Sequence, residues 1–237
     1  MINEVTFWNV VFGAARVYDK ANVSGDARVS GYASVSGDAR VSGDACVYDK
    51  ANVYGDARVS GAARVSGDAR VSGDAHVSGY ASVSGNAHVY GDACVSGDAH
   101  VSGDARVSGY ASVSGDARVS GDAHVSGDAC VSGAARVSGD AHVYGDARVS
   151  GDAHVSGDAC VNTKTGCMHG YFRARSGTYC LTLFTTKSGR VGFTWGCRSG
   201  DDLRAYLSDP SYDWLRDLPL AFLRVFEITN GIGRESD

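Results

Sequence analysis

The chain has 237 residues, 43% of them hydrophobic, with 32 glycines, two prolines and a formal net charge of −5. This length allows one or two domains with a hydrophobic core. The lack of a basic excess argues against a general nucleic-acid-binding protein, and no apolar run reaches the roughly 18 residues of a membrane span. The first residues lack the basic region of a signal peptide. We therefore expect a cytoplasmic protein without a membrane partner.

A valine recurs at every sixth residue from Val5 to Val161, 27 times without interruption. The commonest unit reads Val-Ser-Gly-Asp-Ala-(Arg/His), and sustained hexapeptides are typical of a parallel β-helix. Val is expected to point inward from a short strand, Ala to fit a narrow inner corner, and Gly to adopt backbone angles that other residues resist. Two units replace this Gly by Asp19 and Asp49, because Asp tolerates the left-handed region better than most residues.

The Val-x-x-x-Ala-x pattern resembles the left-handed β-helix hexapeptide family over about residues 5–161. The resemblance implies a triangular prism with 18 residues per coil and a left-handed path, whereas crossovers between parallel strands are normally right-handed. The 27 units would then make about nine coils, and a stacking distance of about 4.8 Å gives a prism ~40 Å long. The resemblance also favours a homotrimer.

The chain is predicted to divide into three parts. Residues 1–12, rich in aromatic and aliphatic side chains, are expected to plug the first coil, because an open coil would expose apolar core and unpaired strand edges. Residues 13–161 form the β-helix, and residues 162–237 are expected to form a small α+β cap on the last coil. The predicted fold class is therefore an all-β solenoid with an α+β C-terminal cap.

Within the cap, strands are predicted at 178–184 and 190–195, joined by a turn at 186–189. Helices are predicted to begin at Ser199-Gly200-Asp201-Asp202 and to run over 212–227 with a break at Pro219. The pair Gly196-Cys197, after a hairpin and before a helix, is similar to C-terminal segments of phage and prophage hexapeptide-repeat proteins. This resemblance implies a phage-encoded protein that acts in the host cytoplasm.

Folding the sequence at 18 residues per coil sorts the residue before each Val onto three faces. The first face carries Arg16, Ser34, Asn52, Arg70, His88, Arg106, His124, His142 and Cys160. The second face carries Asn22, Arg40, Arg58, His76, Cys94, Ser112, Cys130 and Arg148. The third face carries Arg28, Cys46, Arg64, Ser82, His100, Arg118, Arg136 and His154.

The first face is the predicted binding surface. Four of the five tyrosines that directly follow a repeat Val lie on it, as do three of the six repeat histidines. Tyr is common at interfaces because it offers a large area and one hydroxyl. The predicted binding residues are Tyr18, Tyr54, Tyr90, Tyr144, His88, Arg106, His124 and His142. In the alternative interpretation, the tyrosines only shield the strands.

The Arg and His side chains of this face allow two interpretations. They could hold phosphates or respond to pH. Alternatively, Asp at the neighbouring corners neutralises them, since residues 14–161 contain 18 Asp against 12 Lys and Arg. The Asp residues themselves are expected to form turns, because the Gly-Gly-x-Gly-x-Asp motif of calcium-binding β-helices is absent.

No metal or other cofactor is predicted. Four cysteines of the repeat (Cys46, Cys94, Cys130 and Cys160) occupy a variable position and are expected to be reduced thiols. Cys160, Cys167, His169, Cys180 and Cys197 form no Cys-x-x-Cys pair, which argues against zinc. No P-loop and no Gly-x-Ser-x-Gly motif occurs.

The sequence allows three functions to be compared. The best-known left-handed β-helix proteins are trimeric acyltransferases with a catalytic His and a loop that protrudes from a coil, but here no loop interrupts the repeats and six histidines are equivalent. Ice-binding arrays use Thr, where this chain has Arg, His and Ser. We therefore predict a protein without enzymatic activity, which binds or sequesters a host macromolecule, an anionic or nucleotide ligand, or its own copies.

Overall fold

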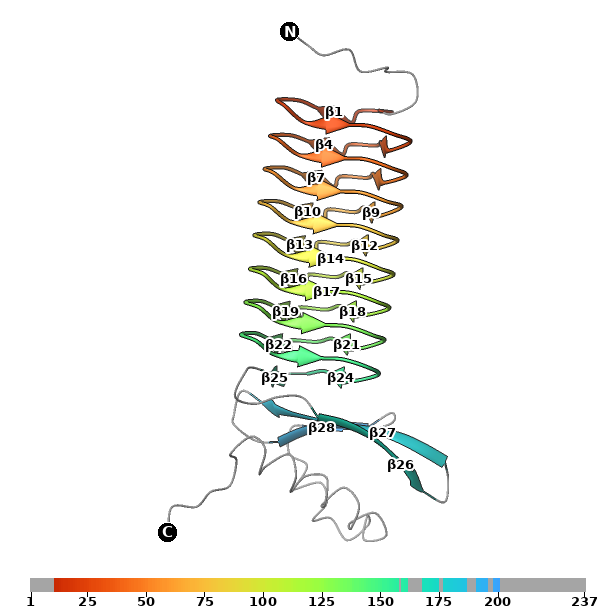
Figure 1. The fold of residues 1–237 in the computed structure, drawn as a ribbon, viewed down its shortest axis with the longest axis vertical. Helices are drawn as coiled ribbons and strands as arrows, with labels where there is room; N and C mark the ends of the chain where they lie inside the picture. The colour runs from red at the N-terminus through yellow and green to blue at the C-terminus, as the bar shows by residue number, and fades with distance from the viewer. Residues whose placement is uncertain are drawn as a thin grey trace.

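The computed structural model describes residues 11–157 and 159–161, and the strands at 168–174, 177–186, 191–195 and 198–200. The hexapeptide repeat folds into a parallel β-solenoid with three flat faces (Figure 1). Residues 1–10 of the predicted plug and most of both predicted helices lie outside the described residues.

Each face is a ladder of short strands, most of which contain a Val and the residue before it. The first face consists of β1 (Arg16–Val17), β4 (Ser34–Val35), β7 (Asn52–Val53), β10 (Arg70–Val71), β13 (His88–Val89), β16 (Arg106–Val107), β19 (His124–Val125), β22 (His142–Val143) and β25 (Ala159–Val161). The second face consists of β2 (Asn22–Val23), β5 (Arg40–Val41), β8 (Arg58–Val59), β11 (His76–Val77), β14 (Cys94–Val95), β17 (Ser112–Val113), β20 (Cys130–Val131) and β23 (Arg148–Val149). The third face consists of β3 (Arg28–Val29), β6 (Cys46–Val47), β9 (Arg64–Val65), β12 (Ser82–Val83), β15 (His100–Val101), β18 (Arg118–Val119), β21 (Arg136–Val137) and β24 (His154–Val155).

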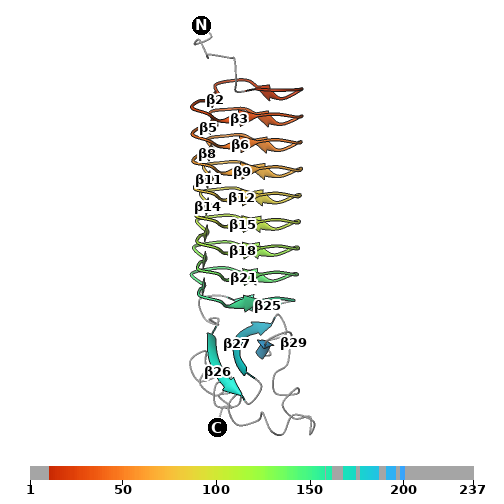
Figure 2. The ribbon, with the colours of Figure 1, turned by 90° about the vertical axis from the view of Figure 1, so that its right-hand side faces the viewer.

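The register of these ladders confirms the predicted 18-residue coil. Arg70 pairs with His88 and His88 with Arg106, each in parallel and 18 residues apart. Descending the solenoid in Figure 1, the chain passes from β13 on the left across the front to β15 on the right. Figure 2 shows the third face turned toward the viewer, consistent with the same path. The coil is therefore left-handed, as predicted.

Backbone hydrogen bonds join each coil to the next on both sides of every Val. The His88 N–H donates to the Ala105 carbonyl at 2.9 Å, and the Tyr90 N–H donates to the Val107 carbonyl at 3.0 Å. The same pattern recurs along all three faces. Side chains before and after each Val are thereby stacked into straight columns that run along the prism.

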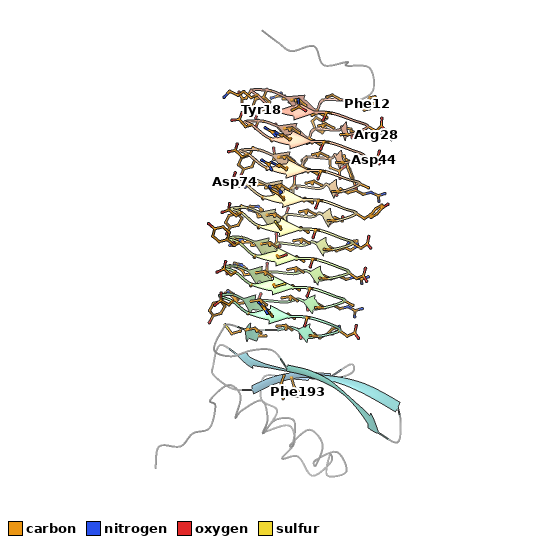
Figure 3. All side chains as sticks on the ribbon, in the orientation of Figure 1. Phe12, Tyr18, Arg28, Asp44, Asp74 and Phe193 are labelled. Atoms are coloured by element: carbon orange, nitrogen blue, oxygen red, sulfur yellow. The ribbon has the colours of Figure 1, made fainter. Side chains whose placement is uncertain are left out.

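Valine and alanine form the core. Every repeat Val from Val29 to Val161 is fully buried, and the repeat Ala side chains from Ala27 to Ala159 are buried with them. Burial of one Val side chain stabilises the fold by about 1.5–3 kcal/mol, and each coil supplies three. The outward residues are left free to vary, and Asp44 and Asp74 project from two different edges of the prism (Figure 3).

The two Asp residues that replace Gly adopt the left-handed conformation that their position requires. The φ angles are 59° at Asp19 and 62° at Asp49, which confirms the prediction for both. Each carboxylate accepts a hydrogen bond from a Gly N–H of the next coil, Gly37 at 3.3 Å for Asp19 and Gly67 at 3.1 Å for Asp49. These bonds partly offset the strain of a side chain at positive φ.

The solenoid begins slightly earlier than expected. Val11 pairs in parallel with Val29, and the Phe12 N–H donates to the Val29 carbonyl at 2.8 Å. The paired region therefore includes two residues that were assigned to the N-terminal plug.

At the C-terminal end, the sheet of the first face continues into an antiparallel sheet (Figure 1). Strand β25 pairs with β27 (Gly177–Thr186), which lies between β26 (Met168–Ala174) and β28 (Val191–Trp195), and β28 pairs with β29 (Arg198–Gly200). Leu183 and Phe193 face each other across β27 and β28 and are fully buried. This pairing covers an edge of the solenoid that would otherwise be open.

The predicted strands are confirmed over residues 178–184 and 191–195, and residue 190 lies outside the described residues. The prediction that a helix starts at Ser199-Gly200 is wrong for these two residues, because they pair with Thr194 and Phe193 in β29. Strand β26 was not predicted. Within the part of the chain that the structure describes, there is no long apolar helix of the kind that spans a membrane.

Candidate functional site

The structure places all eight predicted binding residues on the first face, in two adjacent columns. We name as the basic column the residues before Val on five consecutive strands: Arg70, His88, Arg106, His124 and His142. We name as the tyrosine column the residues after Val on the same face: Tyr18, Ser36, Tyr54, Ser72, Tyr90, Ser108, Ser126 and Tyr144. Because both columns point away from the core, they run side by side along the prism.

The tyrosine column distinguishes the first face from the other two. Between residues 17 and 157, the residue after Val on the second and third faces is Ser everywhere except at Tyr48. On the first face, the side chains of Tyr18, Tyr54, Tyr90 and Tyr144 are 38–50% exposed. In the first five coils Tyr and Ser alternate, so that a small side chain separates successive rings.

A groove lies where this alternation begins. It has a volume of about 380 Å³ and is lined by Tyr18, Ser34, Ser36, Asn52, Tyr54 and Arg70. The small Ser36 leaves this space between the two rings, and Tyr18 marks its upper end (Figure 3). The Ser34 hydroxyl donates to the Tyr18 hydroxyl oxygen at 3.4 Å, and hydrogen bonds from Ser34 and Ser36 lower the pKa of Tyr18.

In the described coils, the arginines form no direct ion pairs with the corner Asp residues. In the described coils no Arg side chain has a carboxylate within 4.0 Å, while Lys20 and Asp38 approach each other to 3.8 Å. The alternative interpretation, in which corner Asp residues neutralise Arg across a solvated surface, needs no such contact and is not tested by these distances; Asp104, for example, opposes the effect of Arg70 and Arg106 on His88. Exposed pairs gain little energy and restrict two side chains, which explains why the guanidinium groups stay in solvent.

Burial and the neighbouring arginines both disfavour a proton on His88. Partial burial lowers the pKa of His88, and the guanidinium groups of Arg70 and Arg106 on the neighbouring strands lower it further, while Asp104 opposes them. On the third face, burial and then Arg136 lower the pKa of His154, against the opposing effect of Asp152. At both histidines, the neighbouring Arg lowers the pKa more than the nearby Asp raises it.

A neutral residue stands at the corner beside His88. Asn86 occupies the corner position that is most often Asp, and it is the only Asn at that position in the repeat. Its Nδ2 donates to Asp104 Oδ1 at 2.9 Å, and Asp104 keeps its negative charge. The segment Arg70–His88–Arg106 is therefore the part of the basic column with the least compensating negative charge.

Farther along the column, His124 and His142 stack directly. Their ring centroids lie 4.8 Å apart with an interplanar angle of 19°. This distance equals the spacing of about 4.8 Å between neighbouring strands. The stack shows that the side chains of the basic column follow the ladder rather than splay away from it.

Four residues of the groove were not predicted as site residues, although three of them had been placed on the first face: Ser34, Asn52, Arg70 and Ser36. The alternation of Tyr and Ser at 18-residue spacing could have revealed the groove. Asn86 could have been noticed as the single Asn at its repeat position.

The described part of the chain shows no other arrangement that suggests a cofactor. No group of three His, Cys, Asp or Glu side chains is placed to hold a metal ion in that part. Cys46, Cys94, Cys130 and Cys160 are free thiols. Exposed tyrosines also occur at the prism edges, where Tyr32, Tyr80 and Tyr110 are each 70–74% exposed, but each stands on a different edge.

Comparison with known families agrees with this architecture. The model of the YdcK β-solenoid repeat matches four segments, residues 63–79, 99–115, 111–127 and 141–157. The chain is a β-solenoid repeat protein. The segments matched to the YdcK repeat lie entirely within the three-faced solenoid. No curated protein sequence matches the chain.

Proposed function

We propose that this β-solenoid is a non-catalytic binding protein whose first face binds an anionic partner. The observation that carries the proposal is the basic column, in which five consecutive strands present Arg or His in register. Arg70 and Arg106, the permanent cations of the column, stand two coils apart, roughly 10 Å at about 4.8 Å per coil, and both repel a proton on His88 between them. An anion bound along the column would relieve this repulsion.

The tyrosine column supports the same role. Rings beside a basic column offer both contact area and hydrogen-bonding hydroxyls to a partner. The coils from Val11 to Gly157 continue without an inserted loop, and this uniformity favours a binding face over acyl transfer at a single His. The partner is of host origin if the chain is phage-encoded.

Retention on immobilised heparin tests the proposal. A chain with net charge −5 should not bind a polyanion through its overall charge, so retention must come from a local basic surface. We expect the protein to be retained at low salt and to elute as salt rises, because binding releases counterions.

Matched double variants locate the surface. R70S/R106S removes two cations from the first face, whereas R40S/R58S removes two from the second face, where Arg40 and Arg58 pair in register. We expect R70S/R106S to elute at clearly lower salt and R40S/R58S to elute close to the wild type. Equal loss in both variants, or no retention of the wild type, would contradict the proposal.

A further inference from the structure

Two features of the first face meet at Arg70. This residue lines the groove between Tyr18 and Tyr54, and it is also the first member of the basic column. A ligand that occupies the groove therefore extends naturally toward His88 and Arg106.

We propose that the first face binds a nucleoside di- or triphosphate, with its base in the groove and its phosphates between Arg70, His88 and Arg106. The inference rests on the proposed anion-binding function and names the ligand class for it. It depends on three properties of the site: the charge at one end, the groove at the other end, and the distance between them.

The phosphate end is defined by unpaired cations. Neither Arg70 nor Arg106 has a carboxylate within 4.0 Å in the described coils, and His88 lies between them in register. Guanidinium groups donate paired hydrogen bonds that match phosphate oxygens. Asn86 replaces the usual corner Asp beside His88, so one negative charge fewer repels an incoming anion, and its Nδ2 donates to Asp104 Oδ1 at 2.9 Å.

The base end is defined by rings and amide groups. The groove presents the faces or edges of two tyrosines together with two hydroxyls and the Asn52 side chain. Asn52 Nδ2 donates to the Lys50 carbonyl at 2.8 Å, which fixes the amide and leaves Oδ1 as an acceptor. Aromatic side chains stack on bases with little preference for their identity, so we expect the groove to accept a purine ring.

The distance between the two ends selects the ligand length. Ser36 in the groove and His88 in the basic column are separated by three coils, which is roughly 14 Å at about 4.8 Å per coil. A monophosphate joins its ring to phosphate through one sugar, so it reaches Arg70 in the groove lining but not His88 or Arg106. A di- or triphosphate chain reaches from the groove to the Arg70–His88–Arg106 segment.

Imidazole NMR of the whole protein tests the proposal. The seven histidines allow the His88 signal to be assigned with one H88Q variant. Three probes are compared: ATP, inorganic tripolyphosphate and adenosine. We expect ATP and tripolyphosphate to shift the His88 signals and to raise its pKa, with ATP binding at least about tenfold more tightly, and adenosine alone to bind weakly.

Variants separate the two ends of the site. R70S/R106S should lower the affinity for ATP and for tripolyphosphate by about tenfold or more, since charge-assisted hydrogen bonds from Arg to phosphate are stronger than the neutral ones that Ser can make. Y18S/Y54S should abolish the preference for ATP over tripolyphosphate and leave tripolyphosphate binding unchanged. The controls R40S/R58S on the second face and Y32S/Y80S at the edges should bind ATP like the wild type.

The outcomes distinguish this inference from the proposed function. If ATP leaves His88 unchanged while heparin retention still depends on Arg70 and Arg106, the nucleotide site is wrong and the anion-binding face remains. If neither ATP binding nor heparin retention depends on Arg70 and Arg106, both proposals fail. An ATP affinity equal to that of tripolyphosphate would overturn the assignment of the base to the groove.

Discussion

The carboxylate of Asp49 accepts a hydrogen bond from the N–H of Gly67, eighteen residues later, at 3.1 Å. This bond links two successive coils at a corner where the backbone has φ of 62°. It shows how the solenoid tolerates a side chain at a position where almost every other unit has Gly, and it leads to a first prediction.

Asp49→Ala should destabilise the solenoid locally by about 1–2 kcal/mol, because Ala keeps the unfavourable φ and loses the carboxylate. Asp49→Gly should cost less, since Gly adopts positive φ without strain. Hydrogen exchange at the Gly67 amide measures the effect, with faster exchange expected in both variants. Unchanged exchange would show that the Asp49 carboxylate does not protect this amide.

Glycine in the middle of the solenoid is required by packing as well as by conformation. A Cβ at Gly85, which has φ of 69°, would lie 3.0 Å from the backbone N and O of Gly103. Gly157 has a similar φ of 66°, but no atom of the described residues lies within 4 Å of its added Cβ. Gly85→Ala should therefore lower the midpoint of denaturant unfolding more than Gly157→Ala. Equal shifts of the two midpoints would mean that the unfavourable φ alone, and not the contact with Gly103, causes the loss of stability.

Stability should fall as the pH drops from 8 to 5. The pKa values of His88 and His154 are lowered in the folded state, so the unfolded chain binds more protons below its ordinary His pKa of about 6.5. The stabilisation from neutral histidine is present above that pH and is lost as the pH falls through the lowered folded-state values. The unfolding free energy of H88Q/H154Q should change less over this range than that of the wild type, and an identical slope would contradict the prediction.

The chain should form a homotrimer, as its resemblance to hexapeptide-repeat proteins implies. Light scattering should then give three times the chain mass of 24.6 kDa. If R70S/R106S changes the mass to that of one chain, the first face is a subunit interface rather than a ligand-binding surface. A monomeric wild type would contradict the predicted assembly.

The repeat predicted the fold accurately because each hexapeptide specifies its own strand, core residues and corner. A buried Val, a buried Ala and a residue with positive φ recur every six residues, and the local requirements leave little freedom for another register. The same regularity predicted which residues share the first face, including Tyr18, His88 and His142. The strand at 168–174 was missed because it lies outside the repeat, where no period indicates the structure.

The chemistry of the face was harder to predict than its composition. Counting charges left both anion binding and neutralisation by Asp open, because a count does not state whether Arg and Asp side chains approach each other. The structure keeps Arg70 and Arg106 free of carboxylates within 4.0 Å, and it shows Asp104 held by Asn86. The groove beside Arg70 likewise depends on the size of one residue, Ser36, between two rings.

The most direct test of the anion-binding first face is the pKa of His88, measured by imidazole NMR in the wild type and in R70S/R106S. Partial burial lowers this pKa in the wild type, and the guanidinium groups on both sides lower it further. We predict that the double variant raises it while the pKa of His154, beside Arg136, stays the same. An unchanged His88 pKa would mean that solvent already screens the two arginines, and the basic column would then have no uncompensated charge to offer an anion.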